Sequence, residues 1–162
     1  MFGMGKNDNY HDSYRYIYAA CIGKVMPIDM LDDSIYSTKI LGDGYAVVTT
    51  QKCVYSPVDG EIVRISNNGH SFNIRTEDGL DVLVHVGKNS NCDESTTTKL
   101  FKKVNDKVGQ GKKLCEVDCD NTHKECTIEV VVNNSDSLEE FMIISDNVMD
   151  IKSPVIKYKK SL

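Results

Sequence analysis

The sequence contains no tryptophan, only three prolines and no long apolar run. A membrane-spanning helix needs about 20 consecutive apolar residues, so we expect no stable insertion into a membrane. The opening stretch "MFGMGKNDNYHDSYRY" lacks the apolar core of a secretory signal. We therefore predict a flexible N-terminal tail over residues 1–14 and a protein that stays in the cytoplasm.

An excess of basic residues is also missing. The sequence has 19 Lys and Arg against 24 Asp and Glu, which gives a formal net charge of -5. Nucleic-acid-binding domains usually carry a basic surface, so we expect no nucleic-acid partner. A chain of 162 residues suits one domain with its own core, which we place at residues 15–162 and expect to be a monomer.

The six cysteines include one dense group, C-x3-C-x3-H-x2-C, formed by Cys115, Cys119, His123 and Cys126. This spacing does not match the C-x2-C pairs of common zinc sites. Thiols of a cytoplasmic protein are normally reduced. We interpret the spacing as incidental, with a zinc site as the less favoured alternative.

Short apolar segments separated by turn sequences run through the chain. The segments include "YAVVTT", "GEIVRI", "LDVLVHV" and "TIEVVV", and the turns include "SPVDG", "SNNG" and "TEDG". This pattern indicates an all-β fold, which we predict to be a flattened antiparallel β-sandwich or barrel-like hybrid with one or two short helices. One helix is predicted at "SDSLEEFMIIS", residues 135–145, where Ser137 and Glu140 make a capping box. A second helical turn is predicted in "KLFKKV", residues 99–104.

A weak internal repeat relates "AACIGKVMPI" to "SPVDGEIVRI" when Gly23 is aligned with Gly60. Apolar residues then fall at matching offsets in the two segments. Two copies of a strand–turn–strand unit predict a duplicated, pseudo-symmetric sandwich.

Two histidines bracket one predicted hairpin, "HSFNIRTEDGLDVLVH". If Thr76 and Gly79 close a two-residue turn, antiparallel pairing places His70 directly opposite His85. Their Cβ atoms would lie roughly 4.5–5.5 Å apart, with Phe72 on the same face.

Two neighbouring imidazoles suit two kinds of chemistry. One is metal ligation, in which a zinc ion at His70 and His85 would need a third ligand. The other is phosphoryl transfer, in which one imidazole attacks phosphorus while the other and nearby backbone N–H groups stabilise the phosphoryl oxygens. Inert surface histidines are a third interpretation, and the local pattern leaves all three open.

Over residues 17–160 the chain resembles the glucose-family enzyme IIA domain of the bacterial phosphoenolpyruvate-dependent sugar phosphotransferase system. The resemblance rests on "GKVMPIDMLDDSIYSTKILGDGYAV", "SPVDGEIVRI", "GHSFNIRTEDGLDVLVHVG" and "KVGQGKKLCEVD". It implies a duplicated antiparallel β-sandwich. It also implies that His85 accepts a phosphoryl group at Nε2 from the phosphocarrier protein HPr and passes it to a cysteine of enzyme IIB, that His70 supports it, and that no cofactor is required.

The resemblance further implies a docking face for HPr and enzyme IIB around the two histidines. Its candidate contributors come from matching segments: Ile35, Tyr36, Leu41, Phe72 and Val84.

Two motifs depart from the family pattern. The family's T-x-H is "NGH" here, with Asn68 in place of the threonine, and its H-x-G-x-D-T is "HVGKNS", with Asn89 and Ser90 replacing an acidic residue and a threonine. Together with Gly87, these residues are expected to support the phosphoryl site. Losing a carboxylate at position 89 removes a negative charge that would repel a phosphoryl dianion.

These departures motivate a second hypothesis, a regulatory or binding module on the same fold with weak or no phosphotransfer. A zinc-binding protein that uses His70 and His85 is the third. The sugar is left undetermined, because specificity in this system resides mainly in the membrane component.

Overall fold

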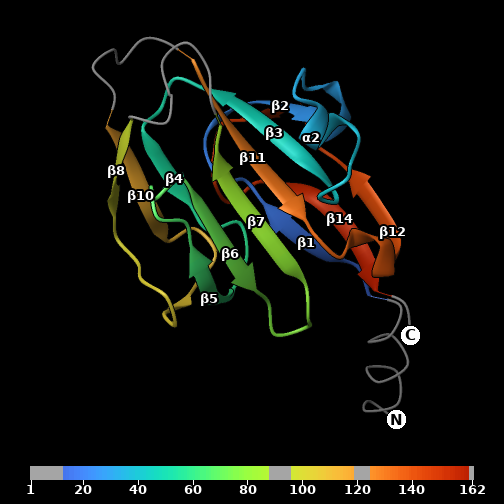
Figure 1. Cartoon of the computed structure of the whole chain (residues 1–162). Helices are drawn as coiled ribbons and strands as arrows, with labels where there is room; N and C mark the ends of the chain where they lie inside the picture. The colour runs from blue at the N-terminus through green and yellow to red at the C-terminus, as the bar shows by residue number, and fades with distance from the viewer. Residues whose placement is uncertain (1–12, 88–95, 119–124, 161–162) are drawn as a thin grey trace.

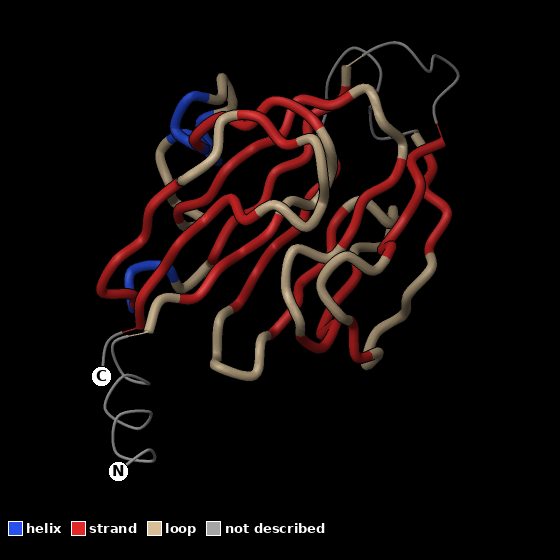
Figure 2. The backbone as a smooth tube through the Cα atoms, turned by 180° about the vertical axis from the view of Figure 1, so that it is seen from behind, coloured by secondary structure: helices blue, strands red, loops and turns tan. Residues whose placement is uncertain are grey.

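The computed structural model describes residues 13–87, 96–118 and 125–160. Strands make up about half of the described residues, and the helical segments are short (Figures 1 and 2). The strands are β1 (Arg15–Tyr18), β2 (Gly23–Pro27), β3 (Asp43–Thr49), β4 (Cys53–Tyr55), β5 (Gly60–Ile65), β6 (Ser71–Arg75), β7 (Asp81–Val86), β8 (Thr97–Leu100), β9 (Lys107–Val108), β10 (Lys113–Asp118), β11 (Cys126–Val132), β12 (Leu138–Ile143), β13 (Asn147–Val148) and β14 (Pro154–Lys160). The helical segments are η1 (Ile28–Met30), α2 (Ser34–Ser37) and η2 (Ser135–Ser137).

In the described part of the chain, the strands form one sheet of eight strands and two sheets of three. The large sheet has the order β13-β2-β3-β11-β7-β6-β5-β9, and the small sheets are β1-β14-β12 and β4-β10-β8. All of their pairings are antiparallel. The predicted antiparallel β-sandwich is confirmed. None of the helices within residues 13–87, 96–118 and 125–160 is long and apolar enough to cross a membrane.

The internal repeat at Gly23 and Gly60 corresponds to a symmetric position in the large sheet. Each glycine begins the strand that is second from one end of that sheet, β2 or β5. Gly23 is paired with Val148 of β13, and Gly60 with Val108 of β9. The small sheets repeat the relation, because β14 lies between β1 and β12 as β10 lies between β4 and β8. Figure 1 shows these two sheets at opposite sides of the molecule.

The side chains of β7 point alternately into the main core and to the opposite face of the large sheet. Val82, Val84 and Val86 are buried in the core, and each contributes roughly 1.5–3 kcal/mol by leaving water. Leu83 and His85 point to the other face. A small second cluster covers part of that face: Ile28, Tyr36 and Val131, with Leu31, Leu41 and Leu83 packed against them.

The predicted helix over residues 135–145 is wrong. Only Ser135–Ser137 form a 3₁₀ turn, and Leu138–Ile143 form strand β12 along β14. The Ser137 hydroxyl donates to the Asn134 carbonyl. Pairing with a distant strand outweighs a local capping pattern, which is the usual reason such predictions fail.

The predicted helical turn over residues 99–104 is also wrong. Its first residues belong to β8, Thr97–Leu100, which pairs with β10. Most of the predicted N-terminal tail, residues 1–12, lies outside the described residues. Tyr14 is described, and the Nζ atom of Lys157 lies 4.1 Å from the centroid of its ring.

The turn between β6 and β7 has three residues between its closing pair rather than two. The Thr76 amide donates to the Leu80 carbonyl (3.0 Å), and the Gly79 amide donates to the Thr76 carbonyl (3.0 Å). Gly79 adopts φ +92°, a left-handed conformation that favours glycine. This geometry corresponds to the three-residue hairpin loop with a glycine bulge.

The bulge shifts the hairpin register by one residue from the prediction. His85 pairs with Ser71, Phe72 pairs with Val84, and the Val86 amide donates to the His70 carbonyl (2.7 Å). The predicted direct pairing of His70 with His85 is therefore wrong, and so is the placement of Phe72 on the face of His85.

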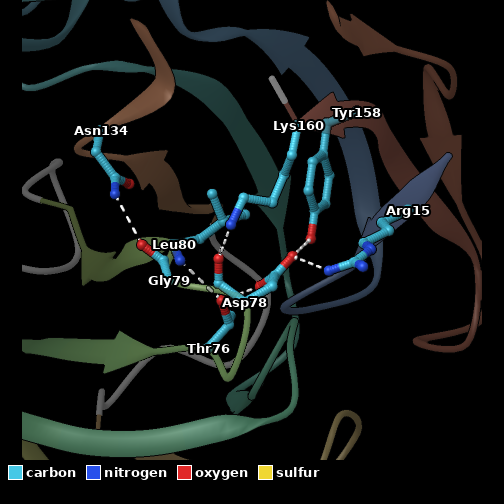
Figure 3. A network of polar contacts seen from close by, with 8 residues as sticks. All are labelled: Arg15, Thr76, Asp78, Gly79, Leu80, Asn134, Tyr158 and Lys160. Carbon is cyan, nitrogen blue, oxygen red and sulfur yellow. Dashed lines mark hydrogen bonds and ion pairs between the residues drawn. The ribbon is translucent and has the colours of Figure 1, made fainter. Parts of the chain in front are cut away.

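A polar network anchors the same turn to the β1-β14-β12 sheet (Figure 3). Asp78 accepts hydrogen bonds at its carboxylate from Arg15 of β1 (2.8 Å), Tyr158 of β14 (2.8 Å) and Thr76. Lys160 donates to the Asp78 carbonyl. The turn is thus fixed by residues far away in the sequence.

Candidate functional site

The side chains of His85 and Glu129 form a hydrogen bond between neighbouring strands. They are direct partners in the β7–β11 ladder, and the His85 Nδ1 lies 2.7 Å from the Glu129 Oε1. A carboxylate only accepts, so Nδ1 carries the hydrogen in this bond. The Glu129 side chain is 5% exposed and the His85 side chain 25% exposed. Glu129 is thus a buried anchor for a histidine that reaches solvent.

Burial raises the pKa of the Glu129 carboxyl, and the charge of Asp33 adds to this increase. The hydrogen bond and the electrostatic attraction from His85 lower the same pKa and partly oppose the effect of burial. The carboxylate form therefore depends on His85 for its stabilisation.

His85 lies on one wall of an open cavity of about 430 Å³. The segment from η1 to α2 lines the same cavity with five residues: Leu31, Asp32, Asp33, Ile35 and Tyr36. The Tyr36 ring stacks on the His85 imidazole, with centroids 5.8 Å apart and planes inclined by 28°. Asp33 caps α2 by accepting from the Ile35 amide (2.9 Å), which holds Tyr36 in place over the imidazole.

His70 lies outside the walls of this cavity. It precedes β6, is buried, and directs its Nε2 to the Thr96 carbonyl. A carbonyl only accepts, so Nε2 carries a hydrogen. The structure brings His70 close to His85 in the ladder, because its neighbour Ser71 pairs with His85, but it directs the His70 ring nitrogen to the backbone.

Asn68 contacts the backbone beside the site, and Gly87 leaves space for the Glu129 side chain. The Asn68 Oδ1 accepts from the His70 backbone amide (3.0 Å). The Gly87 amide donates to the Thr127 carbonyl (2.8 Å), and a Cβ at Gly87 would lie 2.3 Å from the Glu129 Oε2. Gly87 thus leaves room for the carboxylate, and its N–H is already used. Asn89 and Ser90 lie outside the described residues.

The predicted docking residues divide into three groups. Ile35 is 54% exposed, and Ile35 and Tyr36 both line the cavity. Leu41 is half-buried against the second cluster. Phe72 and Val84 are wrong as docking residues, because both are 0% exposed in the main core.

The structure gives the zinc alternatives no assembled site in the described chain. Among the described residues, no three His, Cys, Asp or Glu side chains are placed to hold a metal ion. Cys115 and Cys126 are buried, and burial raises the pKa of the Cys115 thiol to about 12. Metal-binding cysteines are thiolates. Cys119 and His123 of the same motif lie outside the described residues.

Glu129 was missed in the sequence, although a signal was present. It is the one charged residue in the apolar strand "TIEVVV". A carboxylate in such a strand is rarely buried without a partner. The sequence alone did not identify that partner, because His85 lies 44 residues away.

The chain is similar to known proteins over most of its length. A family model described as the phosphoenolpyruvate-dependent sugar phosphotransferase system, EIIA 1, matches residues 15–138. The chain is 30% identical over 142 residues to a glucose-specific EIIA component of Bacillus cereus, covering 86% of this chain and 84% of that protein. It is 32% identical over 142 residues to an N-acetylglucosamine-specific EIICBA component of Escherichia coli. That match covers 85% of this chain but 22% of the longer protein.

A solved structure shares the fold. The glucose permease IIA from Mycoplasma capricolum superposes with a TM-score of 0.75 at 20% identity, covering 90% of this chain and 96% of that one. The family match, the relatives and the duplicated sandwich agree. The chain belongs to the EIIA 1 family of the phosphoenolpyruvate-dependent sugar phosphotransferase system.

Proposed function

We propose that this protein is a cytoplasmic phosphocarrier that accepts a phosphoryl group from phospho-HPr on the Nε2 of His85 and passes it to a cysteine of enzyme IIB. One observation carries the choice of His85. Of the two histidines in the hairpin region, His85 reaches an open cavity, whereas His70 is buried and its Nε2 donates to a carbonyl.

The transfer needs one nucleophilic nitrogen and an approach path. The P–N bond of the donor breaks as a new P–N bond forms at His85 Nε2, and the donor ring leaves with its remaining proton as a neutral imidazole. The exposed edge of His85 and the cavity beside it give the phosphoryl group room to arrive. We assign His70 a supporting role, which requires its ring to exchange the Thr96 carbonyl for a phosphoryl oxygen.

The partners follow from the family. Relatives named as EIICBA components contain a segment similar to this chain, and the chain spans 21% and 22% of two of them. We therefore propose that this protein serves a sugar permease of the same system. The relatives include glucose-specific and N-acetylglucosamine-specific proteins, so the sugar is left open.

The test is incubation with enzyme I, HPr and phosphoenolpyruvate, followed by intact-mass measurement. We expect one added phosphoryl group on the wild type, none on His85→Ala and slower labelling of His70→Ala. His123→Ala is a matched histidine control and should label like the wild type. Absence of labelling on the wild type, or equal labelling of His85→Ala, contradicts the proposal.

A regulatory module is the second candidate, and the position of His70 favours it. A supporting histidine that is held by the Thr96 carbonyl is not free to stabilise a phosphoryl group. Binding to a permease or a metabolic enzyme, in a preparation that shows no phosphotransfer, would support this candidate over the first.

A further inference from the structure

We propose that Glu129 is a positioning residue for His85: its carboxylate fixes the Nδ1–H tautomer, directs reaction to Nε2, and stabilises the imidazolium that forms when Nε2 takes a phosphoryl group. The proposal rests on the proposed function for the identity of the transferred group. It deepens that function by assigning a role to a residue from the second half of the chain.

His85 and Glu129 are direct partners in an antiparallel ladder, so both backbones are fixed by the sheet. The two side chains meet at 2.7 Å, which is the short distance typical of a charge-assisted hydrogen bond. The pair is therefore held in one arrangement before any partner arrives.

The Glu129 carboxylate occupies space that a side chain at position 87 would fill. Gly87 follows His85 by two residues, and a Cβ there would lie 2.3 Å from Glu129 Oε2 and 2.8 Å from Oε1. No side chain larger than hydrogen fits at position 87 unless the carboxylate moves. Gly87, the residue that follows β7, thus leaves room for the Glu129 carboxylate beside His85.

Because Nδ1–H donates to Glu129, the lone pair of neutral His85 lies on Nε2. Attack on phosphorus leaves the ring with a proton on Nδ1 and a phosphoryl group on Nε2, so the ring becomes formally cationic. The buried carboxylate lies where this positive charge develops, and a preorganised countercharge stabilises it.

The groups that face the pair are few in the described chain. Asp33 and Asp32 line the same cavity from the segment before α2, and Tyr36 stacks on the imidazole. No lysine or arginine lines this cavity among the described residues. Among these acidic groups of the described chain, Glu129 is the one whose carboxylate lies within hydrogen-bonding distance of the imidazole. Its removal should therefore dominate any change in the tautomer and reactivity of His85.

The first experiment needs no partner protein. Proton-detected ¹⁵N spectra of the imidazole nitrogens should show His85 as the Nδ1–H tautomer in the wild type. Glu129→Gln keeps an acceptor oxygen and should keep this tautomer, whereas Glu129→Val removes the acceptor and should shift His85 toward the Nε2–H form. A wild-type ring in the Nε2–H form, or no change in Glu129→Val, overturns the proposal. Unchanged methyl shifts of the main core establish that each variant is folded.

The second experiment uses phosphoramidate, a small phosphoryl donor that releases ammonia, so it is independent of HPr. We expect wild-type His85 to be phosphorylated at Nε2, as identified by ³¹P spectra. The rate for Glu129→Gln should fall by about 10- to 100-fold, as expected when a charge-assisted hydrogen bond loses its charge. Glu116→Gln, on β10, is the matched control and should react like the wild type.

The two experiments separate the two proposals. If phosphoramidate labels Nε2 and depends on Glu129 but HPr transfers nothing, the phosphocarrier function fails and the role of Glu129 stands. If HPr labels the wild type and Glu129→Gln at the same rate and with the same pH profile, the function stands and the role of Glu129 is overturned.

Discussion

At the closed end of the β6–β7 hairpin, the Asp78 carboxylate accepts from two side chains on distant strands, Arg15 and Tyr158, and from Thr76 of the same turn. Across the other end of β7, Glu129 contacts the His85 imidazole. The Asp78 side chain is 16% exposed and the Glu129 side chain 5% exposed, so both carboxylates are largely removed from water. Only their partners differ. The Asp78 partners are fixed to the scaffold, and the partner of Glu129 opens onto a cavity.

The difference separates structural from chemical use of a carboxylate. Burial alone raises the pKa of Asp78, but hydrogen bonds from Thr76, Tyr158 and Arg15 outweigh it and lower the pKa overall. Burial raises the pKa of Glu129, and one hydrogen bond does not reverse that effect. A carboxylate with several donors stabilises the fold, and one with a single titratable donor can change the chemistry of that donor.

The largest stability effect is expected from Asp78→Ala. The substitution removes three hydrogen bonds to a charged group and leaves Arg15 without this carboxylate, so the free energy of unfolding should fall by about 2–4 kcal/mol. Urea unfolding measures the change. Asp81→Ala, in the same hairpin, breaks an exposed pair with Arg75 and should cost less than about 1 kcal/mol. Equal losses in the two variants would contradict the structural role of Asp78, and folded Asp78→Ala should still label at His85.

Gly87→Ala is expected to have the opposite profile, a modest stability loss with a clear loss of activity. The new methyl group displaces the Glu129 carboxylate, which should cost about 1–3 kcal/mol. The His85–Glu129 bond lengthens, so phosphorylation should slow by about tenfold or more. Phosphorylation kinetics and thermal unfolding measure the two effects. Gly109→Ala is a control glycine, since the atoms nearest its added Cβ lie at 3.7 and 3.8 Å. Wild-type rates for Gly87→Ala would show that the pair tolerates the methyl group.

The smallest effect is a pair of pH dependences with opposite signs. The folded-state pKa of Asp78 is lowered, so its contribution is complete above the unfolded value of about 3.9 and is lost as pH falls through the folded pKa. The folded-state pKa of Glu129 is raised, so its unfavourable contribution grows as pH rises from about 4.3 through the folded pKa. Relative to wild type, Asp78→Asn should recover stability as the solution is acidified, and Glu129→Gln should gain it as pH rises. Unfolding free energies measured across this pH range check both expectations. If the stabilities of both variants relative to wild type changed in the same direction with pH, the opposite roles of Asp78 and Glu129 would be contradicted.

The sequence predicted the fold class well because its signals were local. Glycine turns and short apolar runs indicated an antiparallel sandwich, and the Gly23–Gly60 repeat indicated its duplication. The helix at 135–145 failed because its capping pattern, Ser137 with Glu140, competed with a strand partner, β14, that no local pattern reveals. The site was predicted in part: His85 lies in the second strand of the predicted hairpin, but a three-residue loop in place of the predicted two-residue turn shifted its partner from His70 to Ser71.

The sequence by itself determined that this chain folds as a duplicated β-sandwich with a histidine in a strand beside a turn-rich hairpin. The alternation of buried and exposed residues in a strand and the residue preferences of turns extend over only a few residues, so both can be recognised in the sequence. Only the tertiary structure decided what His85 contacts. Glu129 and Tyr36 reach it through β11 and α2, from 44 residues after and 49 residues before it in the chain. Contacts between residues so far apart in the chain depend on the order of the strands in the sheet and on their pairing register. A change of one residue in the register moves every side chain of a strand to the other face, and no local sequence pattern specifies it.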